Sequence, residues 1–294
     1  TRTRATKNMP VAAQRNLPNG LMQDEVLAYR REPGQTPLHR ILRYSPDGTS
    51  SSVLTPNGIP NRPTVMHLDH EGTWNYDLLM AIPTASQGPS PVEIYRCDMY
   101  GNVTLVGTEP TPSSYAPLSQ VRGMTVLPNN PAKYGSYAGH LLFVREEPAA
   151  TNTNTNTTYT GSPLYTMDAS GNVTSHGTLG IRAATATVIN GRIIYLSDWG
   201  SDDVFQLVIP DLDNYIGDIL LGVTDSGFAG DPAHTPGLYR LYWDGSQWQT
   251  QQLLNFIEYG IQFKDFSMTI VPEPTSLLFL GSGLALIAAR KRRR

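Results

Sequence analysis

The chain has 294 residues, enough for one large domain or two modest ones. Only 16% of its residues are charged, and 26 Gly and 23 Pro interrupt the apolar segments, a composition that favours short strands and frequent turns over a helical bundle. The formal charge is −3 for the whole chain and, since the last five residues carry +5, −8 for residues 1–289, so neither nucleic acid nor an anionic lipid headgroup is an expected partner of this acidic body.

The chain divides into three parts. Residues 1–20 contain no long apolar run and form an N-terminal segment. Residues 21–270 contain a repeated pattern of apolar segments and turns, and we expect them to form a single all-β domain. Residues 271–294 differ from both in composition and are treated last.

Four segments of the domain align on a glycine: "ILRYSPDG", "IYRCDMYG", "LYTMDASG" and "LYRLYWDG", which end at Gly48, Gly101, Gly171 and Gly245. Each alternates in hydrophobicity and ends in turn-forming residues, which predicts a strand entering a hairpin. Asp98 and Asp168 suit the first position of the turn, and the glycine suits the left-handed position. "NVTLVG" and "NVTSHG" then predict the return strand.

A further apolar strand precedes each hairpin: "VLAYRRE", "LLMAIPT", "LLFVREE" and "ILLGVTD", with another copy in "RIIYLSD". Together with an earlier strand, the unit holds four antiparallel strands in roughly 50–60 residues, which is typical of a propeller blade. We therefore predict an irregular β-propeller of about five blades, with four or six as alternatives, and residues 255–272 as a closing or trailing strand. A β-sandwich or a stacked array of hairpins is the structural alternative.

Cys97 is the chain's single cysteine, so an intrachain disulfide is excluded. It stands where the other repeats have Tyr44, Met167 and Leu241. The position therefore predicts a small buried side chain rather than a reactive thiol.

The connections between the second and third strand of each unit vary most in sequence. The longest contains the polar, low-complexity tract Thr151–Thr160, which we expect to be a mobile loop. In a propeller such loops gather on one face, where ligands commonly bind, although for each loop taken singly a solvated connection that tolerates insertions is the better explanation.

Acidic residues recur near that predicted face. Counting five residues on from Leu27, Leu79, Leu142, Ile193 and Leu220 gives Glu32, Thr84, Glu147, Asp198 and Asp225. If the sheets close into a ring, the four carboxylates lie on one rim, where they could hold Ca²⁺ or hydrogen-bond sugar hydroxyls. Acidic residues are also common wherever strands run out into water, and that explanation is the simpler one. We expect no other cofactor.

Other candidate sites are weaker. "HLDHEG" (His67, Asp69, His70, Glu71) contains possible ligands of a transition metal, but a polar hairpin turn explains it better. "DLDNYIGDI" begins like an EF-hand loop but lacks the required Gly and Glu. The sequence has no G-x-S-x-G, HExxH, CxxC, Walker or GxGxxG motif, so we predict a non-enzymatic protein.

The C-terminal segment "VPEPTSLLFLGSGLALIAARKRRR" has three parts. Pro272 and Pro274 flank Glu273 and prevent helix and sheet there. An uncharged run then predicts a hydrophobic transmembrane helix about 22 Å long, short for a bilayer core of about 30 Å; its small residues Gly281, Ala285 and Ala289 lie on one helix-packing face. The chain ends in five basic residues that are expected to stay on the cytoplasmic side: Arg290, Lys291, Arg292, Arg293 and Arg294.

This order of Val271-Pro272-Glu273-Pro274, apolar helix and basic cluster resembles a PEP-CTERM sorting signal. The resemblance covers 271–294 and implies that a membrane protease, an exosortase, removes the tail and passes the protein to the cell surface or the extracellular matrix of a Gram-negative-type bacterium. It also implies a cleavable N-terminal signal peptide. Since residues 1–20 lack one, we expect either that it has been removed from this sequence or that the sequence is a fragment, and we adopt the first.

These observations lead to a functional hypothesis and an alternative. The protein is expected to be an exported surface or matrix component whose body binds exopolysaccharide or another protein. The alternative is a carbohydrate-active enzyme, a glycoside hydrolase or lyase, that uses rim carboxylates such as Glu32 and Glu147.

Overall fold

The structure is a computed structural model of the chain. It describes residues 11–13, 26–45, 49–85, 90–109, 120–147, 151–152, 157–158, 160–198, 204–224, 235–259 and 266–271.

Five antiparallel sheets of three or four strands make up the body, and we number them sheets 1 to 5. Sheet 1 holds β1 (Val11–Ala13), β2 (Val26–Arg31), β3 (His39–Tyr44) and β4 (Ser51–Val53). Sheet 2 holds β5 (Val65–Leu68), β6 (Leu78–Pro83), β7 (Val92–Cys97) and β8 (Val103–Thr108). Sheet 3 holds β9 (Val121–Val126), β10 (Leu141–Arg145), β13 (Pro163–Met167) and β14 (Val173–Thr178).

The last two sheets share one stretch of chain. Sheet 4 holds β15 (Ala183–Val188), β18 (Ile219–Val223), β19 (Gly237–Trp243) and β20 (Trp248–Asn255). Sheet 5 holds β16 (Ile193–Asp198), β17 (Val204–Val208) and β21 (Phe266–Val271), with β16 in the middle. The chain therefore leaves sheet 4 after its first strand, builds two strands of sheet 5 and then returns.

The predicted four-strand unit is confirmed in sheets 1 to 4, where the spatial order of the strands follows the chain. The predicted trailing strand is also confirmed: β21 pairs along its whole length with β16, from Asp198↔Phe266 to Ile193↔Val271. Sheet 5 departs from the prediction, because it has three strands within the described residues. The interleaving of sheets 4 and 5 explains why two copies of the second strand follow each other so closely in the sequence.

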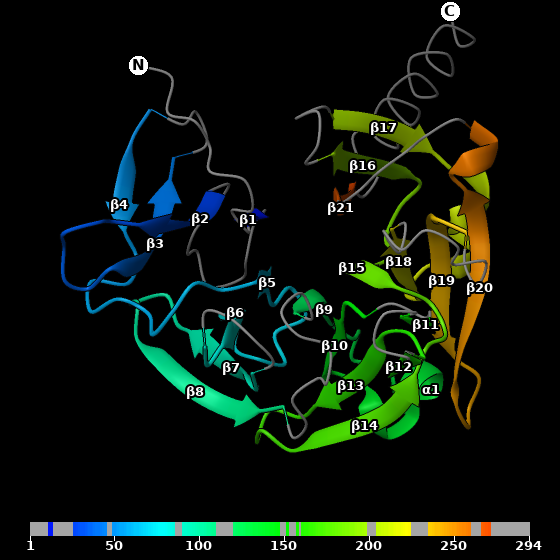
Figure 1. Ribbon diagram of the computed structural model, residues 1–294, viewed down its shortest axis with the longest axis horizontal. Helices are drawn as coiled ribbons and strands as arrows, with labels where there is room; N and C mark the ends of the chain where they lie inside the picture. The colour runs from blue at the N-terminus through cyan, green and yellow to red at the C-terminus, as the bar shows by residue number, and fades with distance from the viewer. Residues whose placement is uncertain are drawn as a thin grey trace, which may run out of the picture.

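The innermost strands of successive sheets lie next to one another: β1 contacts β5, β5 contacts β9, β9 contacts β15, and β15 contacts β21. Figure 1 shows these innermost strands toward the middle of the molecule and the strands β4, β8, β14, β20 and β17 at its periphery. The two-sheet sandwich considered as an alternative does not match this arrangement of five sheets.

The hydrophobic core is divided among the spaces between neighbouring sheets. One cluster joins Leu27 and Ile41 of sheet 1 to Met80 of sheet 2, and another joins Leu79 of sheet 2 to Phe143 of sheet 3. Equivalent clusters lie between sheets 3 and 4 and between sheets 4 and 5. The second strands of sheets 2 to 4 are covered on both faces, so their residues are apolar almost without alternation, and β10 and β18 are buried at every position.

Two features were not predicted. The tract expected to be a mobile loop contains a short ladder of β11 (Thr151–Asn152) with β12 (Thr157–Thr158), because β-branched threonines favour extended backbone. A single helical turn, α1 (Pro131–Tyr134), precedes the 3₁₀ turn η1 (Gly135–Tyr137). Its signal was present in the sequence, since Asn130 caps the turn and Pro131 occupies its first position.

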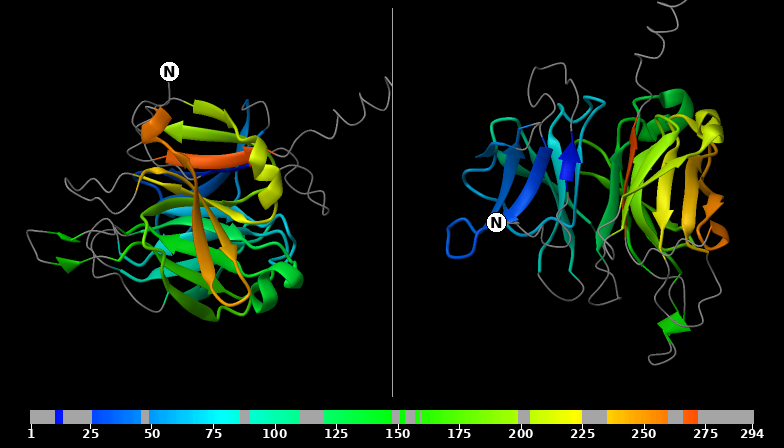
Figure 2. Two further views of the ribbon diagram at one scale, coloured as in Figure 1. Left: turned by 90° about the vertical axis from the view of Figure 1, so that its right-hand side faces the viewer. Right: turned by 90° about the horizontal axis from the view of Figure 1, so that it is seen from above.

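The two edges of the sheets carry different connections, and Figure 2 shows them on opposite sides. The η2 turn (Pro210–Tyr215) and α1 lie on the side toward which β21 points, whereas η3 (Ile257–Tyr259) and the β11–β12 ladder lie on the other. We call the edge at which the second strands end, marked by Glu32, Thr84 and Glu147, the loop rim. The opposite edge, marked by Asp77, Asp218 and the hairpin turns that begin at Asp98 and Asp168, is the turn rim.

Candidate functional site

The loop rim carries the predicted acidic residues, but arginine accompanies them. Glu32 follows β2, and its carboxylate lies 3.3 Å from Arg40 Nη1 and 3.4 Å from Arg30 Nε. A carboxylate held between two guanidinium groups is largely neutralised. The Glu32 position is therefore better suited to hydrogen bonding than to binding a free cation.

The other members of the predicted acidic set are placed only in part. Glu147 follows β10, and its backbone N–H donates to Ser162 Oγ over 3.3 Å. Thr84 occupies the same place after β6 and donates its N–H to the Pro91 carbonyl. Asp198 is the last residue of β16, with no side-chain placement described, and Asp225 lies outside the described residues. The ring of four carboxylates therefore stays a prediction.

A buried ion pair joins sheets 2 and 3 at the loop rim. Arg145, at the end of β10, and Glu109, just after β8, are each 1% exposed. Arg145 Nε donates to Glu109 Oε1 over 3.0 Å, Nη2 contacts Glu109 Oε2, and Nη2 also donates to the Ser90 carbonyl. Burial raises the pKa of Glu109 and the Arg145 charge opposes that rise. Burial and the same carboxylate raise the pKa of Tyr165 to about 12.

A second group of charges joins sheets 3 and 4 at the same rim. Glu146 Oε2 lies 2.9 Å from Arg122 Nε, and its Oε1 lies 2.8 Å from Arg182 Nη2. Arg122 is in β9 and Arg182 immediately precedes β15, so this carboxylate connects the first strands of two sheets. Within the described ranges, no three His, Cys, Asp or Glu side chains are grouped so that they could hold a metal ion.

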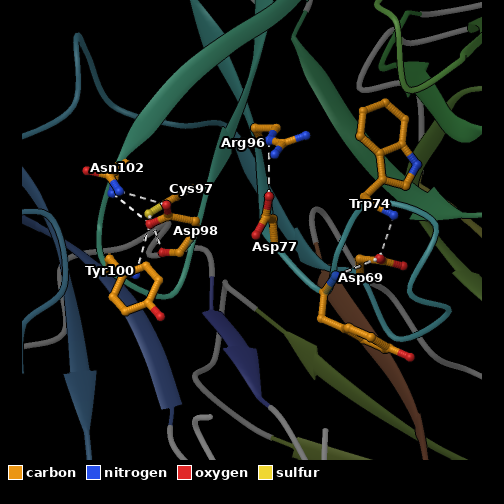
Figure 3. Close-up of polar contacts among 9 residues, drawn as sticks. Asp69, Trp74, Asp77, Arg96, Cys97, Asp98, Tyr100 and Asn102 are labelled. Atoms are coloured by element: carbon orange, nitrogen blue, oxygen red, sulfur yellow. Dashed lines mark hydrogen bonds and ion pairs between the residues drawn. The ribbon is translucent and has the colours of Figure 1, made fainter. Parts of the chain in front are cut away.

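On the turn rim, Asp69 organises the connection between β5 and β6 (Figure 3). Its buried carboxylate accepts four backbone N–H groups at 2.8–3.1 Å, from Glu71, Gly72, Trp74 and Tyr76. This segment is the "HLDHEG" motif, and it forms the polar turn preferred from the sequence. His67 also has a structural partner, because its Nε2 accepts the N–H of Val126 over 3.2 Å. Burial lowers the pKa of His67 to about 3, so the imidazole is neutral.

An ion pair recurs at one position of the turn rim. Asp77 precedes β6, and its Oδ2 lies 3.1 Å from Arg96 Nε on β7 (Figure 3). Asp218 precedes β18 in the same way, and its Oδ2 lies 2.6 Å from Arg240 Nε on β19. The strand registers agree, since Leu79 pairs with Arg96 and Leu220 pairs with Arg240.

These pairs were not predicted. One position of the third strand holds Arg43, Arg96, Thr166 and Arg240, and the residues that precede the second strands are Glu25, Asp77, His140 and Asp218. In the three units with an arginine in the third strand, the residue before the second strand is acidic. In the unit with Thr166, that residue is His140. That internal covariation is the signal that would have revealed the pair.

The two hairpin turns predicted from the repeat have the same hydrogen bonds. Asp98 Oδ1 accepts the N–H of Tyr100 and of Asn102 at 2.8 and 2.9 Å (Figure 3), and Asp168 Oδ1 accepts those of Ser170 and Asn172 at 2.9 Å each. Although desolvation opposes it, the hydrogen bonds hold the pKa of Asp98 below its usual range.

The glycine of each turn has a second role. Gly101 and Gly171 have φ of +85° and +88°, as predicted. A Cβ on Gly101 would lie 1.7 Å from the carbonyl oxygen of Leu54, and one on Gly171 would lie 2.1 Å from that of Val106. Each turn therefore packs on the backbone of the preceding sheet. Gly48, the first glycine of the repeat, lies outside the described residues.

Cys97 is fully buried, which confirms its predicted placement. Burial, followed by the nearby Asp98 charge, raises the pKa of the thiol to about 12. Since the thiolate is the reactive form, Cys97 is inert at neutral pH.

The C-terminal motif begins where the fold ends. Val271 is the last residue of β21 and pairs with Ile193. The remaining residues of the predicted signal lie outside the described residues: Pro272, Glu273, Pro274, Gly281, Ala285, Ala289 and Arg290 to Arg294. Among the helices that the structure describes, none is both long and apolar enough to cross a membrane.

Comparison with known families identifies residues 271–294 as a PEP-CTERM protein-sorting motif, and no curated protein matches the chain. The match confirms the resemblance recognised in the sequence. Such signals are recognised by exosortase, a membrane protease, and direct membrane processing followed by export to the cell surface or extracellular space. The motif defines the route of the protein and says nothing about the body.

Proposed function

We propose that the protein is a non-enzymatic component of the bacterial cell surface or extracellular matrix whose loop rim binds exopolysaccharide. The observation that carries this proposal is the combination of a sorting motif at 271–294 with a rigid body that presents its most variable connections at the rim opposite Val271. The proposed host is a bacterium with two membranes, in which the exported protein ends outside the cell.

In this proposal the five sheets are the blades of an irregular β-propeller. Three facts support it: the innermost strands of successive sheets are neighbours, the cores lie between successive sheets, and the second-to-third-strand connections all begin at one rim. This geometry suits binding, because loops from separate blades converge on one face while the sheets stay fixed.

The charge pattern of the loop rim supports binding rather than hydrolysis. Glu32 and Glu146 contact two arginines each, and Glu109 is fully buried against Arg145. A glycoside hydrolase needs two accessible carboxyl groups, one of them protonated, on either side of the scissile bond. Arginine–carboxylate pairs instead suit the hydroxyl and carboxylate groups of a polysaccharide.

The test is retention of the full chain, solubilised in detergent, on immobilised exopolysaccharide from the producing strain. The proposal predicts retention without release of reducing ends. Replacing 148–160 or 225–234 by a short Gly-Ser connection should weaken retention in steps, because several loops contribute. Product release abolished by one carboxylate-to-amide change, such as Glu147→Gln, would favour the enzyme instead, and no retention at all would contradict polysaccharide binding.

A further inference from the structure

The place where the chain leaves the fold restricts how the body can be oriented on a membrane. Val271 is at once the last hydrogen-bonded residue of β21 and the first residue of the sorting motif, so no spacer separates the two. The apolar run of the tail begins at Ser276. Four intervening residues span at most about 14 Å even when fully extended.

The strand registers place Val271 on the turn rim. Ile193 pairs with Val271 on one side and with Val208 on the other, so all three lie at one end of sheet 5. In sheet 4 the same rim holds the start of β18, where Ile219 pairs with Val188, and Ile216 lies just before it. Figure 2 agrees, since η2 lies on the side of the molecule toward which β21 points.

The turn rim of sheets 4 and 5 exposes two apolar side chains. Val208 is 59% exposed and Ile216 is 56% exposed. Two ion pairs lie next to them, Arg192 with Asp213 over 3.3 Å and Lys133 with Asp218 over 2.7 Å, and Asp211 of η2 is exposed. Apolar side chains among paired charges suit the headgroup boundary of a bilayer.

The opposite rim cannot reach the same surface. Six residues of β21 at about 3.3 Å each put the loop rim roughly 20 Å farther from the tail. Ile257, which is 64% exposed, lies on the loop rim. It follows Asn255, the last residue of β20, which pairs with Gly237; Gly237 pairs with Val223, the last residue of β18.

We propose that, before processing, the short tether holds the turn rim against the bilayer with Val208 and Ile216 at the headgroups, so that the loop rim faces away from the cell membrane. The partner is a zwitterionic lipid surface. An anionic one is disfavoured because three aspartates share this rim, the half-buried Asp98 and Asp168 and the exposed Asp244. This orientation rests on the proposed export route. While the tail is still attached, the turn rim lies at the lipid headgroups and the loop rim lies in water.

The experiment uses the full chain in phosphatidylcholine vesicles with a fluorescent label on Ile216→Cys or, as the matched control, on Ile257→Cys. Both positions are exposed isoleucines, and the native Cys97 is buried and stays unlabelled. Spin-labelled lipid headgroups should quench the label at 216 several-fold more than the label at 257. Equal quenching, or stronger quenching at 257, would overturn the proposal.

A second variant carries ten Gly and Ser residues inserted between Val271 and Pro272. It should lose most of the quenching at 216, and quenching that survives the insertion would contradict a role of the tether. Flotation with the vesicles is measured in parallel. It reports insertion of the tail, which the export route requires, separately from the orientation of the body.

Discussion

Arg96 Nε lies 3.1 Å from Asp77 Oδ2, and the pair closes the turn rim of sheet 2 beside the buried Cys97. Asp218 and Arg240 repeat this arrangement in sheet 4 with the same strand register. Such a diagonal pair fixes the start of the second strand against the third. Two units of the repeat, sheets 2 and 4, therefore share an electrostatic contact as well as an apolar pattern.

The Asp77 carboxyl is expected to make stability depend on pH. Burial, only partly offset by Arg96, raises its pKa from 3.8 to about 6. The stabilisation that comes from this raised pKa is therefore fully present below about pH 4 and is lost as the pH rises through 6. Asp77→Asn should remove this dependence, so that the stability of the wild type relative to the variant falls between pH 4 and 6. Denaturant unfolding at several pH values measures it.

The control for that experiment is Asp211→Asn, which changes an exposed carboxylate on the same rim. His67 contributes with the opposite sign, because its pKa of about 3 means that stability is lost as the pH falls below 6.5. His67→Gln separates the two effects. An Asp77→Asn variant that keeps the wild-type pH dependence would show that Asp77 does not titrate in this range.

The Arg145–Glu109 pair is expected to be strongly coupled. Either Arg145→Met or Glu109→Gln leaves a buried group without its partner, which should cost about 3–5 kcal/mol of unfolding free energy. The double variant Arg145→Met/Glu109→Leu removes both charges and should recover much of the loss. A double-mutant cycle by denaturant unfolding measures the coupling, and strictly additive losses would contradict it.

The hairpin glycines are expected to differ in their tolerance of substitution. Gly101 and Gly245 both have positive φ, +85° and +103°, but only Gly101 has a backbone oxygen within reach of an added Cβ. Gly245→Ala should cost about 1–2 kcal/mol for the left-handed backbone alone. Gly101→Ala should cost about 1–3 kcal/mol more, because sheets 1 and 2 must separate. Equal midpoints of thermal unfolding for the Gly101→Ala and Gly245→Ala variants would contradict this close packing.

The proline pair of the sorting motif is expected to be required for processing. Pro272→Ala/Pro274→Ala allows the segment to extend the following helix and should leave the protein unprocessed in the inner membrane. Thr275→Ala, one residue farther along, is the control and should be released normally. Fractionation and immunoblotting of cells measure this, and normal release of the double variant would refute the role of the motif.

The sequence was most informative where the physics is local. The turn residues Asp98 and Gly101 define a hairpin, and the uninterrupted apolar run of β6 indicates a strand covered on both faces. The tail motif was also readable, since its three parts follow each other directly.

The remaining features depend on contacts between distant segments. Nothing near Ile193 in sequence indicates that β16 pairs with β21, more than 60 residues away, and so the composition of sheet 5 could not be predicted. The arginines of the loop rim were overlooked for the same reason. Arg122 lies in β9 and Arg182 precedes β15, and only the packing of sheets 3 and 4 brings both to Glu146.

Intact-mass analysis of the protein recovered outside the cell tests the export account most directly. The account predicts a product that ends near Pro274 and lacks the basic cluster Arg290–Arg294, since the tail serves for delivery alone. An extracellular or envelope protein that still carries those arginines would contradict it.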